Sequence, residues 1–136
     1  MTRDHSETLL ALLPDVPALQ VAWVGVPLPA LETIQEAIAP QGGEVALFGP
    51  KALAKIQQGP PRSFEALVLN SEAIAIDKAL LKACFDRLEN SAVAIIIGGA
   101  IDHALLESAG FSNPSVISDE RGDLQVAHKC FAWGSL

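Results

Sequence analysis

FEALVLN at 64–70 and SAVAIIIGG at 91–99 decide the fold, because each is a short apolar run that ends in a polar or glycine turn. Continuous apolar runs of this length are typical of strands that are buried on both faces of a parallel sheet. A helical pattern lies between them, and HALLESAGF at 103–111 predicts another helix before DLQVAHK at 123–129, which predicts a strand. Alternating strands and helices predict right-handed crossovers and helices on both faces of the sheet.

The upstream half continues this alternation. HSETLLALL at 5–13 predicts a short helix that Pro14 ends, and ALQVAWVGV at 18–26 predicts a buried strand. Pro29 suits the first turn of a helix that runs to about residue 40, and EVALFG at 44–49 predicts the next strand. A further helix is expected to end near residue 58.

Local signals mark the ends of the later elements. Asp77 and Asp102 are candidate N-caps, and Gly110 stands where a left-handed residue ends a helix. The segments 114–118 and 124–132 are strand-like and are separated by DERGD, which predicts an antiparallel hairpin at the end of the chain.

This downstream order resembles the second half of class I S-adenosylmethionine-dependent methyltransferases, in which a helix ending in an AGF-type turn precedes two antiparallel strands. The resemblance covers roughly half of the chain. It implies one methyltransferase-like, Rossmann-like domain over 1–136, of class α/β, with a mainly parallel sheet and a C-terminal antiparallel hairpin. Between the strands at 44–49 and 64–69 there is no room for the extra strand of most family members, so about six strands are expected.

Composition agrees with one domain and excludes some partners. The chain has 136 residues, half of them apolar, which is enough for a single well-filled core. Its net charge of −7 argues against nucleic acids and anionic membrane surfaces, because phosphate groups need clustered Lys and Arg. The longest apolar runs are too short to span a bilayer, so a soluble, cytoplasmic protein is expected.

The cofactor signature of the family is reduced here. Its first strand normally opens into a glycine-rich loop, but this chain has VGVPLP at 24–29, with a single glycine and two prolines. Its second strand normally ends in an acidic residue, but this chain has LFGP at 47–50. If S-adenosylmethionine binds at all, the resemblance places it against the strand-end residues Gly25, Val26, Phe48, Gly49, Asn70, Ser71 and Glu72. For each loop the alternative is an ordinary turn.

No other motif indicates chemistry. His5, His103 and His128 have neither metal-ligand spacing nor an evident nucleophile partner, and no GxSxG elbow or P-loop occurs. Cys84 and Cys130 are far apart and are expected to be buried thiols rather than a disulfide or a zinc site. No catalytic residue and no metal ligand is therefore predicted.

The C-terminal CFAWGSL concentrates aromatic residues in a chain that has few. Phe131 and Trp133 either pack against their own domain or anchor a homodimer, since exposed aromatic side chains favour interfaces. Trp23 lies within a predicted strand and is expected in the core.

Three functions remain from the sequence. The first is a methyltransferase-like domain that has lost cofactor binding and acts as a non-catalytic binding or structural module beside a protein partner. The second is an active S-adenosylmethionine-dependent methyltransferase with an atypical cofactor site. The third, which has less support, is a domain that binds a different small ligand in the same crevice. The fold cannot choose among them, because one scaffold hosts many functions.

Overall fold

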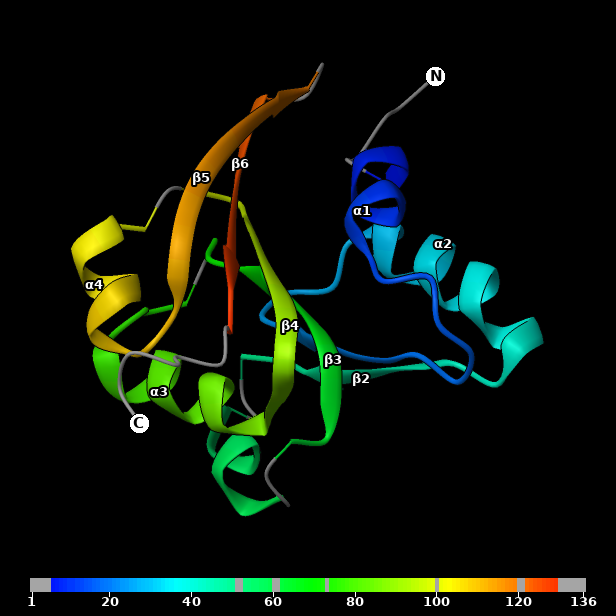
Figure 1. Ribbon diagram of the computed structural model, residues 1–136, viewed down its shortest axis with the longest axis horizontal. Coiled ribbons are helices and arrows are strands. Elements are labelled where there is room, and N and C mark those ends of the chain that lie inside the picture. Colours follow the sequence, from blue (N-terminus) through cyan, green and yellow to red (C-terminus); the bar gives the residue numbers. More distant parts are fainter. Residues whose placement is uncertain are drawn as a thin grey trace.

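A mixed sheet runs through the protein (Figure 1), for which the computed structural model describes residues 6–50, 53–59, 62–72, 74–99, 101–119 and 122–129. Within these residues the sheet has six strands in the order β2-β1-β3-β4-β6-β5. The strands are β1 (Gln20–Val24), β2 (Glu44–Phe48), β3 (Phe64–Asn70), β4 (Leu88–Ile97), β5 (Ser112–Asp119) and β6 (Gly122–His128). β1 to β4 are parallel, whereas β6 is antiparallel to both of its neighbours. The predicted fold class, including the C-terminal antiparallel pair, is confirmed.

Helices cover both faces of the sheet. The helices are α1 (Ser6–Leu12), α2 (Pro29–Ile38), η1 (Ala39–Gln41), η2 (Leu53–Gln58), α3 (Lys78–Arg87) and α4 (His103–Ser108), where η marks a 3-10 helix. In Figure 1, α1 and α2 lie on one side of the sheet, and α3 and α4 lie on the other. Among the described residues, no helix is long and apolar enough to cross a membrane.

Each strand contributes to two cores because neighbouring side chains point to opposite faces. In β1, Val21 and Trp23 pack with α1 and α2, whereas Ala22 and Val24 pack with η2 and α3. β3 alternates in the same way. Trp23 is fully buried, as the sequence predicts. β1 and β3 are almost continuously apolar because both of their faces are covered.

Local capping signals act as the sequence predicts. The Asp77 carboxylate accepts a hydrogen bond of 2.8 Å from the backbone N–H of Leu80, and this bond caps the start of α3. Asp102 similarly accepts from Ala104 at the start of α4. Gly110 has a φ of +113° after the end of α4, which is the left-handed C-terminal conformation expected for it.

Two elements differ from the sequence prediction. The segment before residue 58 forms the 3-10 helix η2, a conformation that is common in short connections. β4 begins at Leu88, directly after α3 and about four residues earlier than expected. The early start follows from long-range pairing, because Leu88 pairs with Phe64 of β3. Lys129 also holds this segment, since its Nζ donates to the carbonyls of Phe85 and Leu88, at 2.9 and 2.8 Å. A register irregularity in the β3–β4 pair absorbs the extra residues.

The strand order places the candidate site. β1 and β3 are neighbours, but the chain leaves β1 toward β2 on one side and returns to β3 on the other. In open parallel sheets, ligands bind beyond the carboxyl ends of the strands at such a switch point. The carboxyl ends in question are Val24–Gly25 and Asn70–Ser71.

Candidate functional site at the carboxyl ends of β1 and β3

Gly25 brings the turn after β1 into direct contact with the end of β3. Its φ is +109°, and its N–H donates to the carbonyl of Phe48 at 2.9 Å. A Cβ at this position would lie 2.3 Å from the backbone oxygen of Asn70. No real side chain tolerates that distance, so glycine is required here by the approach of β3 as well as by the backbone conformation.

Asn70 bridges the two strand ends with its side chain. It is only 1% exposed, and its Nδ2 donates to the carbonyl of Val26 at 2.9 Å. Its Oδ1 accepts from the backbone N–H of Glu72 at 3.2 Å. Trp23 donates its indole N–H to the same Val26 carbonyl, at 3.0 Å. We call this set of contacts among Trp23, Gly25, Val26 and Asn70 the β1–β3 junction.

The loop after β4 also packs against this junction. A Cβ on Gly98 would lie 2.3 Å from Asn70 Oδ1 and 2.9 Å from the Glu72 nitrogen. Ser71 Oγ lies 3.1 Å from the carbonyl oxygen of Ile97 and 2.9 Å from that of Gly99, to which it can donate. Protein groups thus satisfy the polar atoms of Asn70 and Ser71 that a ligand would otherwise contact.

The structure brings together five of the seven residues expected to line a cofactor site. Gly25, Val26, Asn70, Ser71 and Glu72 lie at or beside the junction, and Glu72 is exposed. Phe48 reaches the neighbouring turn with its backbone carbonyl. Its side chain instead packs on the α3 face, edge-on to Phe64 with ring centroids 5.9 Å apart. Gly49 has open space where a Cβ would be.

The sequence placed Trp23 in the core but did not reveal its part in the junction. The signal that could have found it is chemical, since a buried indole N–H needs an acceptor. The nearest backbone turn after β1 provides that acceptor, three residues further along the chain.

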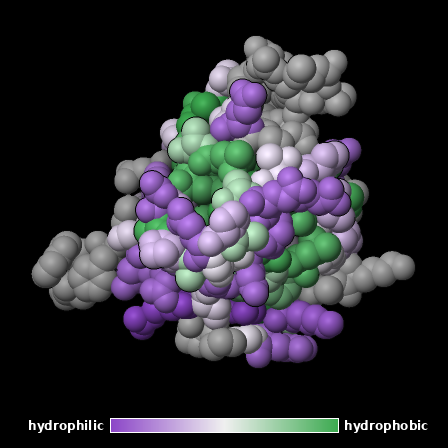
Figure 2. Space-filling view, turned by 90° about the vertical axis from the view of Figure 1, so that its right-hand side faces the viewer, coloured by the Kyte–Doolittle hydropathy of each residue, from purple (hydrophilic) through white to green (hydrophobic). Residues whose placement is uncertain are grey.

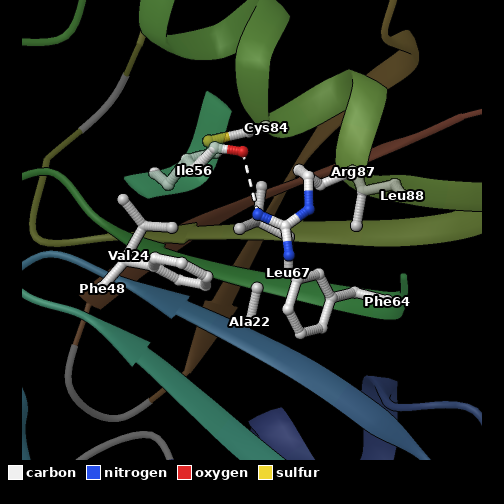
Figure 3. A pocket seen from close by; sticks show the side chains of 9 residues that line it. All are labelled: Ala22, Val24, Phe48, Ile56, Phe64, Leu67, Cys84, Arg87 and Leu88. Atoms are coloured by element: carbon white, nitrogen blue, oxygen red, sulfur yellow. Dashed lines mark hydrogen bonds between the residues drawn. The ribbon is translucent and has the colours of Figure 1, made fainter. Parts of the chain in front are cut away.

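A separate cluster surrounds Arg87 on the α3 face (Figure 3). Its guanidinium lies 5.5 and 5.0 Å from the ring centroids of Phe48 and Phe64, and Nη1 donates to the Ile56 carbonyl at 2.8 Å. Within the described residues its Nε has no hydrogen-bond partner. Burial lowers the pKa of Arg87. The cavity beside it measures about 10 Å³, which is room for one water molecule at most. The cluster therefore serves packing rather than ligand binding.

Cys84 lines the same cluster and is buried, as predicted. Burial raises the pKa of its thiol to about 12, an effect that the nearby Arg87 only partly offsets. The thiolate is the nucleophilic form of cysteine, so Cys84 is unreactive near neutral pH.

The remaining chemical candidates do not gather into a site. His103 lies in the first turn of α4 and His128 at the end of β6. Across the part of the chain that the structure describes, no three His, Cys, Asp or Glu side chains group as metal ligands would. His5, Cys130, Phe131 and Trp133 lie outside the described residues. The homodimer through Phe131 and Trp133 stays a prediction.

Comparison with known proteins gives the fold a name. No family model matches the sequence, and no curated protein matches it either. The structure is similar to an S-adenosylmethionine-dependent methyltransferase from Archaeoglobus fulgidus, with a TM-score of 0.64, 10% identity and coverage of 90% of each chain. A second such enzyme, from Aquifex aeolicus, gives a TM-score of 0.60 at 11% identity and covers 90% of this chain and 88% of that one.

A possible exported protein from Bordetella parapertussis is also similar, with a TM-score of 0.58 and 14% identity. The match covers 93% of this chain, which spans 66% of the length of that protein. Identities this low carry the fold and not the activity. The six-stranded sheet, its strand order and these neighbours together show that the chain has a class I methyltransferase-like, Rossmann-like fold.

Proposed function

We propose that this chain is a methyltransferase-like domain that does not bind S-adenosylmethionine and that acts as a non-catalytic, protein-binding module. The observation that carries the proposal is the β1–β3 junction. The Asn70 side-chain amide donates a hydrogen bond to the Val26 carbonyl at the switch point, which is where a ligand of this fold would be held. No catalytic residue and no cofactor is assigned.

Opening the junction for a cofactor is energetically unfavourable. Separating the turn from β3 would break the bond from Asn70 to Val26 and leave a buried amide without a partner. An unsatisfied buried polar group costs roughly 1–3 kcal/mol. The turn offers the cofactor few backbone hydrogen-bond donors in return, because Pro27 and Pro29 have no N–H. The end of β2 offers no carboxylate for ribose hydroxyls, since it reads Phe48–Gly49.

The second candidate is an active methyltransferase that holds S-adenosylmethionine mainly through backbone atoms. The solved structures that this chain resembles include S-adenosylmethionine-dependent methyltransferases, and this favours the alternative. Glu72 is exposed beside Asn70 and Ser71 and would be an acidic group available to the cofactor. This function requires the turn at Gly25 and Val26 to move away from Asn70.

Isothermal titration of the purified chain with S-adenosylmethionine and S-adenosylhomocysteine tests the proposal. We expect no binding heat up to about 1 mM ligand, a limit that corresponds to a binding free energy of about −4 kcal/mol. Micromolar binding that Glu72→Gln weakens, while the exposed Glu107→Gln on α4 leaves it unchanged, would support the enzyme instead.

The proposal also includes a cytoplasmic location and a homodimer through the C-terminal segment. Sedimentation of the chain and of its Phe131→Ala/Trp133→Ala variant tests the dimer. A dimer that persists in the variant contradicts this part of the proposal. It does not bear on cofactor binding, which the titration tests separately.

A further inference from the structure

A groove of about 360 Å³ lies between α1, the loop after it and the C-terminal end of α2. The side chains that line it are mainly apolar and include Leu10, Leu13, Val16, Leu19, Ala37 and Ile38. Leu13 and Leu19 are buried and form its deeper part, whereas Ala37 and Val16 are exposed, Val16 to 37%. Figure 2 looks onto the side of the molecule that carries α1 and α2 and shows hydrophobic areas bordered by hydrophilic ones.

The surroundings of the groove are acidic. Residues 6–50 contain five carboxylates and no Lys, Arg or His, and every Lys or Arg except Arg3 follows position 50. Asp15 lines the groove itself. Glu7 is exposed and stands one helical turn before Ala11, a lining residue, so both lie on the same side of α1. This half of the molecule therefore presents a groove that combines apolar side chains with polar groups, in an acidic surrounding.

The two helices that frame the groove would suit a third helix packed between them. The seven residues of α1 extend about 10 Å, the length of two turns of a docked helix. A helix bound in such a groove inserts apolar side chains at positions i, i+3, i+4 and i+7. Basic residues beside that stripe would face Asp15 and Glu7, and nucleic acids would be repelled by the same carboxylates.

We propose that the groove between α1 and α2 docks an amphipathic helix of a partner protein, with its apolar stripe against Leu10, Val16 and Ile38 and its Lys and Arg residues toward Asp15 and Glu7. The proposal rests on the proposed function and names the partner class of that binding module. It places the interaction surface away from the β1–β3 junction.

Fluorescence anisotropy with synthetic peptides tests this inference on the full chain. The probe is a labelled helical peptide with four leucines at i, i+3, i+4 and i+7 flanked by lysines. One matched peptide carries glutamate in place of lysine, and another has the leucines scrambled. We expect binding of the first with a Kd on the order of 10 µM, with the other two at least about tenfold weaker.

Paired variants locate the binding. Asp15→Lys reverses the charge in the groove, whereas Glu107→Lys makes the same change on the exposed surface of α4. Ala37→Gln adds bulk in the groove, and Ala104→Gln makes the same change on α4. The two groove variants should lose about tenfold in affinity, which corresponds to about 1.4 kcal/mol, and the two α4 variants should stay within about twofold.

Several results would overturn the inference. They are no binding of the lysine peptide, equal loss in groove and α4 variants, or self-association of the chain that Asp15→Lys abolishes, which would make a second copy the occupant. Titrating the Asp15→Lys variant with S-adenosylhomocysteine separates the two proposals. If S-adenosylhomocysteine gives binding heat, the proposed function is contradicted and the docking inference is not. If the chain gives no such heat and also fails to bind the lysine peptide, the docking inference alone is contradicted.

Discussion

Gly25 combines two constraints that a single substitution can test. Its φ is +109°, and a Cβ there would lie 2.3 Å from the Asn70 carbonyl oxygen. Gly25→Ala should therefore lower the free energy of unfolding by roughly 1–3 kcal/mol or more, since a strained backbone alone costs that amount. Gly49→Ala is the matched control, because nothing lies within 4 Å of the added methyl group. Urea denaturation of both variants is the measurement, and equal losses would contradict the junction geometry.

A substitution of Asn70 that keeps its shape can test the hydrogen bonds of the junction separately from its packing. Asn70→Asp keeps the shape but replaces the N–H donor that faces the Val26 carbonyl with an oxygen. We expect a loss of about 1–3 kcal/mol at neutral pH. The loss should shrink at low pH, where a protonated carboxyl group can donate again. Asn90→Asp, on an exposed residue, adds the same charge and should change little. A pH-independent loss at position 70 would argue against the bond to Val26.

Cys84 gives a pH dependence whose sign follows from its burial. Its folded pKa of about 12 lies above the unfolded value, so its contribution to stability is fully present below about pH 9 and is lost as pH rises toward 12. Cys84→Ala removes this titration. The stability difference between wild type and Cys84→Ala should thus be smaller at pH 10.5 than at pH 7. A difference that stays constant between these pH values would show that the thiol is not buried.

Among the elements, α3 depends on a local cap that can be removed. Asp77→Ala should lower the free energy of unfolding by about 1 kcal/mol, because it leaves the N–H of Leu80 without its acceptor. Asp86→Ala near the other end of α3 is the control. Asp86 forms an exposed ion pair with Lys82, and such pairs contribute less than about 1 kcal/mol. A larger loss at Asp86 than at Asp77 would contradict this assignment.

Sequence reasoning succeeded where the signal is local. Asp77, Asp102 and Gly110 were identified because caps and left-handed turns depend on a residue and its near neighbours. The early start of β4 was missed because residues 88–91 are polar apart from Leu88, and their conformation depends on distant Lys129. Likewise, the sequence indicated which loops meet at the switch point. It could not show that Asn70 bonds to Val26, because those residues are 44 positions apart.

At the scale of the whole molecule, the closed strand ends and the proposed docking groove lie on different parts of one scaffold. The β1–β3 junction lies at the strand ends where this fold holds ligands. The groove between α1 and α2 is lined by apolar side chains and Asp15, and it lies elsewhere on the molecule. On our proposal, a domain with this arrangement would keep the methyltransferase-like sheet as a frame and use its helical surface for contact with a partner. The account therefore predicts that binding of a partner helix and occupation of the strand ends are independent.

The most direct test of the central claim is a two-dimensional ¹⁵N–¹H NMR titration with S-adenosylhomocysteine. It observes the backbone amides of Gly25, Val26 and Ser71 and the side-chain amide of Asn70 in one experiment. Because the junction is closed by its own hydrogen bonds, we expect that none of these signals moves up to about 1 mM ligand. Progressive, saturable shifts of the Asn70 side-chain amide together with Gly25 would show that the junction opens for the cofactor and would overturn the proposed function.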